Sequence, residues 1–488
     1  MKKLRPIMFV GTGSDVGKSM LVTGVCRLLK QKGYHPAPFK AQNMSLNSFV
    51  TPDGLEIGRA QAVQAEACGI ACTTDMNPIL LKPSGANTSQ VVLHGKPIGD
   101  QTIRDYFLGN NKEHLFKEAK TAFARLQQTY SPIVLEGAGS ISELNLKHRD
   151  IVNMRMAAAA DADVYLIADI DKGGVFASVY GSITLLEPWE KALIKGVIIN
   201  KFRGDASLFE EGKLLLEKLT GVPVLGVIPY AKEIYIEEED SVGLQKKNTT
   251  TASGLVTIAI ILLPYIANYT DFNVLEKDPR THVFYTTDPQ SIATSDIIIL
   301  PGSKNTIQDL LFLRNQGIAT VVLEAYNQQK KIIGICGGYQ MLGKMIEDPM
   351  GVESSIKAIP GLGILPITTR LATEKTTTQC RFRFKNMTAA CVGYEIHMGE
   401  TTIMGGEPLN HIGATPEGVI VGNCWGTYIH GILDNTTVIE ALLQEYTTAK
   451  AIPFNYKAYK EENYDKLATL LEEHLDINAI ISQTQIPL

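Results

Sequence analysis

Two series of short apolar segments, each alternating with helix-like segments, restrict the fold of this chain more than any other feature. Short apolar runs rich in Val and Ile favour buried strands, and helices between them favour parallel sheets covered on both faces. The sequence therefore predicts an α/β protein with two doubly wound domains. The expected strands are Ile7–Val10, Ile133–Leu135, Val164–Ile167, Gly196–Ile199 and Val224–Val227 in the first series, then Leu255–Leu263, Val283–Tyr285, Ile297–Leu300, Ile332–Ile335 and Val419–Val421 in the second.

A polar tract separates the two series. It contains the acidic run Glu237–Asp240 and the polar run Lys246–Ser253. A chain of 488 residues is also too long for a single hydrophobic core. We therefore expect a first domain over residues 1–232, a linker over 233–253, a second domain over 254–446 and a helical tail over 447–488.

A glycine-rich loop follows the first expected strand and precedes a helical pattern. In such a loop the backbone N–H groups curl around phosphate oxygens, the lysine adds positive charge and the serine hydroxyl can bind Mg²⁺. Threonine stands where the strict G-x-x-x-x-G-K-[ST] spacing has its first glycine, so the loop resembles the variant found in dethiobiotin synthetase. The sequence predicts ATP binding by Gly11, Thr12, Gly13, Gly17, Lys18 and Ser19.

Cys336 lies where an apolar segment meets two glycines and a helical pattern begins. A side chain at such a strand-turn-helix corner is pushed out of the sheet and can act as a nucleophile. A thiol needs a nearby imidazole to be largely thiolate at neutral pH, and His430 is the candidate. Since free cysteines are often buried, a core cysteine is the alternative interpretation.

Composition limits the partners and the location of the protein. The net charge of −5 provides no broad basic surface for nucleic acid. Seven cysteines without a C-x-x-C pair indicate a reducing compartment. The longest apolar run, Leu255 to Ala267, is too short to span a membrane and contains Pro264. We expect a cytoplasmic protein that binds neither nucleic acid nor membranes; the sequence does not indicate its oligomeric state.

A nucleotide site and a thiol-histidine site on one chain together indicate amide ligation. Glutamine would be hydrolysed at Cys336 through a thioester, and a carboxylate activated by ATP would capture the ammonia. Since free ammonia is mostly protonated in neutral water, its production and use within one shielded protein is an advantage.

Several long and unusual sequence segments extend over nearly the whole chain. They are Lys40–Ser48, Asp53–Gln61, Met76–Pro83, Leu135–Ser140, Asp169–Ala177, Asn200–Asp205, Leu300–Thr306, Gly393–Gly399 and the surroundings of Cys336 and His430. In the same order, these segments resemble those of the cobyric acid synthase family. The resemblance implies amidation of the b, d, e and g carboxylates of adenosylcobyrinic acid a,c-diamide with ATP and glutamine. It also implies a P-loop NTPase-like, dethiobiotin synthetase-like first domain and a flavodoxin-like class I glutamine amidotransferase second domain.

The resemblance also implies roles for residues of the first domain. Mg²⁺ would be held by oxygen atoms, the ligands that this ion prefers. A lysine would neutralise the substrate carboxylate or the transferred phosphoryl group, and a strand-end pair would recognise adenine. The implied residues are Ser19, Glu136 and Asp53 for Mg²⁺, Lys40 for substrate activation, and Asn200 and Lys201 for adenine.

In the second domain, backbone N–H groups at Gly302 and Gly337 are the candidate oxyanion donors. Most class I amidotransferases have a glutamate two positions after the catalytic histidine, whereas this chain has Ile432. The group that orients His430 is therefore not at its usual position. His397 is either near a substrate or a structural histidine, and the sequence leaves both interpretations open.

Two other functions remain as alternatives. Cobyrinic acid a,c-diamide synthase shares both domains and the chemistry. A partitioning-type ATPase with a degenerate, non-catalytic amidotransferase module is a more distant alternative, favoured only by Ile432.

Overall fold

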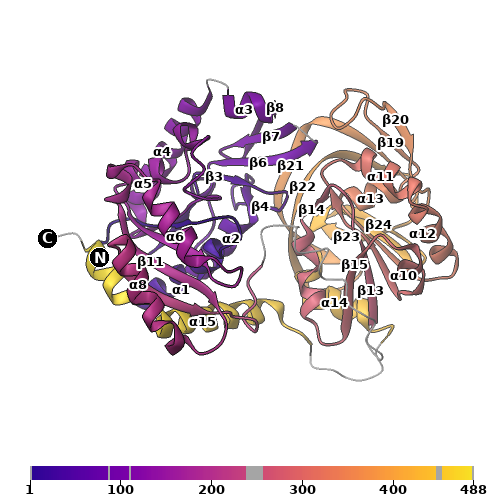
Figure 1. Cartoon of the computed structure of the whole chain (residues 1–488). Helices are drawn as coiled ribbons and strands as arrows, with labels where there is room; N and C mark the ends of the chain where they lie inside the picture. The colour runs from indigo at the N-terminus through magenta and orange to yellow at the C-terminus, as the bar shows by residue number, and fades with distance from the viewer. Residues whose placement is uncertain (1–2, 86–87, 109–110, 238–255, 447–452, 486–488) are drawn as a thin grey trace. The chain divides into compact units, whose positions relative to one another are not determined.

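The computed structural model describes residues 3–85, 88–108, 111–237, 256–446 and 453–485 (Figure 1). The chain forms two compact units. Unit 1 comprises residues 1–44, 56–237 and 458–488, and unit 2 comprises residues 45–55 and 238–457. Most of the predicted linker lies outside the described residues. Among the helices that the structure describes, none has the length and apolar character needed to cross a membrane.

A six-stranded parallel sheet forms the centre of unit 1, as the first series of apolar segments predicts. The strand order is β12-β11-β10-β1-β9-β2, with β1 and its P-loop in the interior of the sheet. β1 is completely buried because helices cover both faces, which explains its unbroken apolar sequence. The strands are β1 (Ile7–Gly11), β2 (Ala37–Phe39), β9 (Ile133–Glu136), β10 (Asp163–Asp169), β11 (Ile194–Phe202) and β12 (Val224–Pro229).

Two helices of unit 1, α1 and α2, carry residues of the candidate site. α1 starts at Lys18, immediately after the glycine-rich loop, and α2 carries a row of buried amide side chains. The helices are α1 (Lys18–Gln31), α2 (Arg59–Cys68), α4 (Asn111–Thr129), α5 (Met154–Ala159), α6 (Val175–Thr184), α7 (Pro188–Lys191) and α8 (Glu210–Thr220).

A second, four-stranded sheet in unit 1 was not predicted from the sequence. Its strand order is β3-β6-β7-β8, and β3 carries the residues that follow Lys40. The strands are β3 (Gln42–Met44), β6 (Ile79–Gly85), β7 (Thr88–Leu93) and β8 (Lys96–Thr102), followed by helix α3 (Ile103–Leu108).

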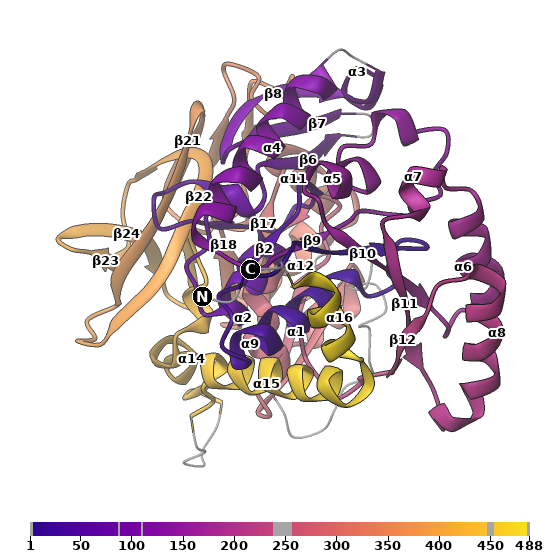
Figure 2. The ribbon, with the colours of Figure 1, turned by 90° about the vertical axis from the view of Figure 1, so that its left-hand side faces the viewer.

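The C-terminal helices, α15 (Tyr456–His474) and α16 (Ile477–Thr484), are part of unit 1 rather than a separate tail. Figure 2 shows them beside α1. A methyl group at Gly24 of α1 would lie 2.5 Å from a methyl carbon of Leu471, so the two helices meet where the side chain is absent. Arg27 donates to Asp465 at 2.7 Å along the same contact.

Unit 2 is built around a twelve-stranded mixed sheet. Strands β15, β13, β16, β18 and β25 pair in parallel and form its doubly wound part. Val419–Val421 lies in strand β24, as predicted, but β24 runs antiparallel to β25 and not parallel as expected for this series. The strands are β13 (Val256–Ile261), β15 (Thr281–Thr286), β16 (Ile297–Leu300), β18 (Lys331–Ile335), β19 (Met345–Glu347), β20 (Ala358–Pro360), β21 (Ile367–Phe384), β22 (Ala390–Ile403), β23 (Glu407–Ile412), β24 (Thr415–Val421), β25 (Cys424–Thr427) and β26 (Ile429–His430).

The helices of unit 2 are mostly short. They are α9 (Asn273–Lys277), α10 (Pro289–Thr294), α11 (Thr306–Asn315), α12 (Ile318–Asn327), α13 (Gly337–Leu342) and α14 (Thr436–Leu443), with a 3₁₀ turn, η5, at Tyr269–Phe272. A small two-stranded sheet pairs β14 (Ile266–Ala267) with β17 (Gly302–Ser303).

The segment Ser45–Leu55 belongs to unit 2, although its sequence precedes most of unit 1. Its strand β4 (Ser48–Val50) packs through Phe49 and Val50 on Tyr394 of β22. The Ser48 N–H donates to the side chain of Asn268 at 3.0 Å, and the Tyr394 hydroxyl donates to the Ser48 carbonyl at 3.2 Å. The division of the chain therefore differs from the predicted single first domain over residues 1–232.

Candidate active sites

Cys336 occupies a tight corner between β18 and α13. Its backbone has φ 51° and ψ −106°, a conformation that non-glycine residues rarely adopt and that is typical of functional sites. A methyl group at Gly338 would lie 1.9 Å from the Leu300 carbonyl oxygen, so α13 can approach β16 this closely only with glycine there. The corner predicted from the sequence is thus present.

His430 lies beside Cys336 and is held by Asp271. Nδ1 of His430 is 2.6 Å from the Asp271 carboxylate, which also accepts from the N–H of Gly431 at 3.0 Å. Cys336 lies close enough to the imidazole to contribute to its pKa, and the Cys336 thiol itself donates to the Ile396 carbonyl at 3.8 Å. Burial alone lowers the pKa of His430, but the charge and hydrogen bond of Asp271, together with Cys336, raise it to about 10. This favours an imidazolium beside the sulfur.

Asp271 was missed by the sequence analysis. It lies in η5, 159 residues before His430, and takes the place of the glutamate that is absent at Ile432. The available signal was weak. Asp271 lies within the buried sequence Tyr-Thr-Asp-Phe, and a buried carboxylate needs a hydrogen-bond or charge partner. His430 of the same unit, in turn, needed a carboxylate to orient it.

The two candidate oxyanion segments lie next to each other and to the imidazole. A methyl group at Gly302 would be 3.4 Å from Cε1 of His430, and one at Gly337 would be 2.8 Å from the backbone nitrogen of Ser303. The ring of Tyr394 stacks on His430 with a centroid separation of 5.4 Å. The structure thus brings Cys336, His430, Gly302 and Gly337 together.

His397 lies in a different environment from His430. It stacks on Tyr428 with a centroid separation of 3.7 Å, and its Nδ1 is 2.8 Å from the Gly399 carbonyl oxygen. Burial lowers the pKa of His397 to about 4, so this imidazole is neutral. These contacts favour the structural interpretation of His397.

In unit 1 the glycine-rich loop is braced by residues from the sheet. Nζ of Lys18 donates to the carbonyl groups of Gly13 and Gly139 at 2.9 and 3.0 Å. Asn200, at the end of β11, donates to the Val16 carbonyl at 2.8 Å. Lys201 donates to the backbone of Asp15 and forms an ion pair with Asp169. The structure therefore places both Asn200 and Lys201 against the loop.

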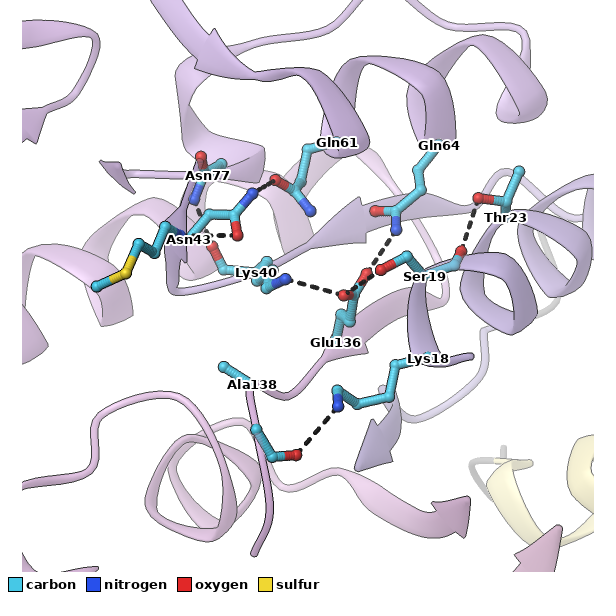
Figure 3. Close-up of polar contacts among 12 residues, drawn as sticks. Lys18, Ser19, Thr23, Lys40, Asn43, Gln61, Gln64, Asn77, Glu136 and Ala138 are labelled. Atoms are coloured by element: carbon cyan, nitrogen blue, oxygen red, sulfur yellow. Dashed lines mark hydrogen bonds and ion pairs between the residues drawn. The ribbon is translucent and has the colours of Figure 1, made fainter. Parts of the chain in front are cut away.

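Glu136, at the end of β9, is the centre of a buried polar cluster (Figure 3). Its Oε1 accepts from the Ser19 hydroxyl at 2.8 Å and from Nζ of Lys40 at 2.9 Å, and its Oε2 accepts from Gln64 at 2.6 Å. Burial alone raises the pKa of Glu136, but Lys40 and these hydrogen bonds lower it overall. Glu136 is therefore an anion whose position is fixed by three donors.

Ser19 and Glu136 of unit 1 fit a magnesium ion, whereas Asp53 belongs to unit 2. A hydroxyl and a carboxylate 2.8 Å apart are hard oxygen donors, and Mg²⁺ commonly takes its other ligands from phosphates and water. Asp53 lies in the Ser45–Leu55 segment of unit 2, where its carboxylate accepts from the Thr51 hydroxyl at 2.5 Å. The described residues contain no group of three or more His, Cys, Asp and Glu side chains suited to a metal.

Comparison with known proteins also divides the chain into two parts, although the first family model includes the segment Ser45–Leu55. Residues 7–242 match the model of the CobQ/CobB/MinD/ParA nucleotide binding domain, and residues 257–438 match that of the CobB/CobQ-like glutamine amidotransferase domain. The chain is 58% identical over 486 residues to a cobyric acid synthase of Parabacteroides distasonis, with 98% of each chain covered. It is 56% identical over 485 residues to that of Bacteroides fragilis and 46% identical over 501 residues to that of Citrobacter koseri, again with 98% of each chain covered.

Proposed function

The chain belongs to the cobyric acid synthase family, and from this we propose how its residues carry out the reaction. It is a ligase of cobalamin biosynthesis that amidates carboxylates with ATP and with glutamine as the nitrogen donor. The specific substrate we propose is adenosylcobyrinic acid a,c-diamide, amidated at its b, d, e and g carboxylates. The observation that carries the glutaminase assignment is that Asp271 holds His430 beside Cys336.

Glutamine hydrolysis would proceed through a thioester on Cys336. The sulfur attacks the carboxamide carbon, and the oxyanion is stabilised by backbone N–H groups at Gly302 and Gly337. His430 gives a proton to the departing ammonia and then removes one from the water that hydrolyses the thioester to glutamate. Asp271 keeps the imidazole oriented and balances its positive charge.

Carboxylate activation would take place beside the glycine-rich loop. A substrate carboxylate attacks the γ-phosphorus of ATP and releases ADP, and ammonia then displaces phosphate from the acyl phosphate to form the amide. Lys18 and Lys40 supply positive charge for the transferred phosphoryl group. Bound Mg²⁺, held by Ser19 and Glu136, would neutralise the phosphate oxygens.

The remaining residues of the loop would bind the nucleotide. Gly11, Thr12, Gly13 and Gly17 offer backbone N–H groups to the phosphates. Asn200 and Lys201 would border the nucleotide, since both contact the loop from the end of β11. We place the reaction in the cytoplasm, where thiols stay reduced, because the proposed glutamine hydrolysis requires a reduced Cys336.

Mass spectrometry of the reaction products tests this function. The protein is incubated with Mg-ATP, glutamine and adenosylcobyrinic acid a,c-diamide, beside a Cys336→Ala variant supplied with either glutamine or ammonia. We expect four successive carboxylate-to-amide conversions by the unmodified protein. The variant should lose them with glutamine and regain them with ammonia. A Cys391→Ala variant, which alters another buried cysteine of the same unit, is the control and should behave like the unmodified protein.

The absence of conversion by the unmodified protein would contradict the proposed substrate, and cobyrinic acid would be tested next. Conversion by Cys336→Ala with glutamine would contradict the role of Cys336.

A further inference from the structure

Two glutamines on α2, Gln61 and Gln64, lie next to the Glu136 cluster and are fully buried. They are three residues apart, so their side chains project from the same face of the helix. In each side-chain amide, one polar atom forms a hydrogen bond with a neighbouring side chain, and the other polar atom has no hydrogen-bond partner among the described residues. Buried amide atoms without a hydrogen-bond partner are rare in proteins and call for an explanation.

The orientation of the Gln64 amide is fixed by Glu136. The Gln64 NH₂ group donates to Oε2 of Glu136 at 2.6 Å, while Oε1 accepts from Ser19 and Lys40. The amide oxygen is therefore turned away from Glu136. Among the residues that the structure describes, this oxygen has no hydrogen-bond partner.

The orientation of the Gln61 amide is fixed from the opposite side. The backbone N–H of Met44 donates to the side-chain oxygen of Asn43 at 2.9 Å, so the Asn43 NH₂ group faces Gln61. That NH₂ donates to the Gln61 oxygen at 3.0 Å. The Gln61 nitrogen is therefore turned away from Asn43, and no described residue accepts a hydrogen bond from it.

The two helical neighbours thus present one donor and one acceptor side by side. Figure 3 shows the amide nitrogen of Gln61 and the amide oxygen of Gln64 turned toward each other above Lys40 and Glu136. A primary carboxamide has the matching groups, since its oxygen accepts and its NH₂ donates. A carboxylate has only acceptors, so it would meet the Gln64 oxygen without a hydrogen atom between them.

We propose that Gln61 and Gln64 bind a primary carboxamide of the corrinoid and discriminate it from a carboxylate. The Gln61 NH₂ donates to the oxygen of this carboxamide, and the NH₂ of the carboxamide donates to the Gln64 oxygen. This inference rests on the proposed function, in which the substrate arrives with two amides and gains four more. The ligand is either an amide that the substrate carries on arrival or the amide that has just formed.

Such a site would contribute to the positioning of the reacting group. Lys40 and Gln64 both donate to Glu136, so an amide bound at the glutamine pair lies one side chain away from the lysine that we assign to carboxylate activation. An amidated side chain held there would keep that position from being occupied by a second carboxylate. Gln61 and Gln64 thus form a site that selects a carboxamide of the corrinoid over a carboxylate.

A Gln61→Glu substitution tests the proposal with little change in shape. One carboxylate oxygen can still accept from Asn43, while the other replaces the free NH₂ donor with an acceptor. Dissociation constants are measured with a non-hydrolysable ATP analogue present, for three corrinoids: adenosylcobyrinic acid a,c-diamide, adenosylcobyric acid and cobyrinic acid, which has no amide. For the Gln61→Glu variant we expect the dissociation constant of an amide-bearing corrinoid to rise about tenfold or more, and that of cobyrinic acid to rise less than about twofold.

The pattern of loss identifies the source of the amide. Weakening for both the a,c-diamide and adenosylcobyric acid indicates an amide carried on arrival, and weakening for adenosylcobyric acid alone indicates the newly formed amide. Equal dissociation constants of variant and unmodified protein for all three corrinoids would overturn the proposal. That result would leave the proposed function intact if the unmodified protein still amidates its substrate.

Two further variants separate recognition from misfolding. Gln61→Met removes the donor without adding charge. It should also weaken the binding of amide-bearing corrinoids more than the binding of cobyrinic acid. Gln90→Glu makes the same exchange at a buried glutamine of β7 and should leave all three dissociation constants unchanged. Glutaminase activity, which depends on unit 2, is measured for each variant. An effect of Gln90→Glu equal to that of Gln61→Glu would also contradict the proposal.

Discussion

Replacing Asp271 with asparagine would remove the negative charge beside His430 and change the size of the side chain very little. The carboxylate and the imidazole are 2.6 Å apart, and neither side chain is more than 4% exposed. The asparagine oxygen can still accept a hydrogen bond from a neutral imidazole, but it cannot balance the charge of an imidazolium. We therefore expect Asp271→Asn to impair glutamine hydrolysis at the steps in which His430 carries a proton.

The raised pKa of His430 sets the scale of the effect. The environment raises it from 6.5 to about 10, and each pKa unit corresponds to about 1.4 kcal/mol, so the folded protein favours the imidazolium by about 5 kcal/mol. Removing one partner of a buried ion pair typically costs about 3–5 kcal/mol. If most of this is expressed in the transition state, kcat/KM for glutamine falls by about 10² to 10⁴.

Stability provides a second measure with a defined pH dependence. A group whose pKa is raised on folding contributes stability below its unfolded value, here near 6.5, and this contribution is lost as the pH rises through about 10. The difference in free energy of unfolding between unmodified protein and Asp271→Asn should therefore be largest below pH 6.5 and should shrink toward pH 10. Urea unfolding at pH 6 and pH 10 measures it.

Glutamate release measures the catalytic effect, and amidation with ammonia is the internal control because it does not require Cys336 or His430. Asp288→Asn is a matched control in the same unit. Asp288 caps α10 through hydrogen bonds from Gln290 and Ser291, and asparagine caps helices about as well. A kcat/KM for Asp271→Asn within about threefold of the control would refute the role of Asp271. A stability loss that does not depend on pH would refute the charge argument.

Three further substitutions test other parts of the structure. Lys18→Ala should lower amidation with either nitrogen source at least about 100-fold, because it removes the charge that we propose lies near the phosphates, whereas glutaminase activity should remain. Product analysis would disprove this role if amidation with ammonia persisted. Gly338→Ala places a methyl group 1.9 Å from the Leu300 carbonyl and should lower the melting temperature in thermal unfolding, whereas an unchanged Tm would show that the corner can relax. Tyr394→Phe removes the hydrogen bond to Ser48 and should lower the free energy of unfolding by about 1 kcal/mol in urea titrations; no loss would mean that the bond contributes nothing.

The parallel strands of both units were predictable because buried strands need continuous apolar sequence. All five segments of the first series lie within strands β1, β9, β10, β11 and β12. The four-stranded sheet of unit 1 was not predictable in the same way. Its strands β6 and β8 contain Lys82, Pro83 and Lys96, so their sequence lacks the apolar run that identifies a strand.

Some residues of the candidate sites can be recognised from the sequence immediately around them, and others cannot. Cys336 and the loop before Lys18 stand out because their glycines are local signals: Gly17 adopts a positive φ before α1, and Gly338 leaves room for α13 beside Leu300. Asp271 has no such signal, since its role depends on a histidine 159 residues away. The Gln61 and Gln64 arrangement also depends on tertiary structure, because only Asn43 and Glu136 fix which amide atoms are left over.

The segment Ser45–Leu55 gives a covalent link between the two kinds of chemistry. Lys40 and Asn43 belong to the Glu136 cluster of unit 1, and the chain then continues directly into Ser48, whose carbonyl accepts from Tyr394. Tyr394 in turn stacks on His430. Lys40 therefore lies only eight residues before Ser48, where β4 begins. This strand packs on Tyr394, the residue that stacks on His430. The Ser45–Leu55 segment is therefore one of the places where the chain passes between unit 1 and unit 2, and it leaves unit 1 directly after Lys40 and Asn43.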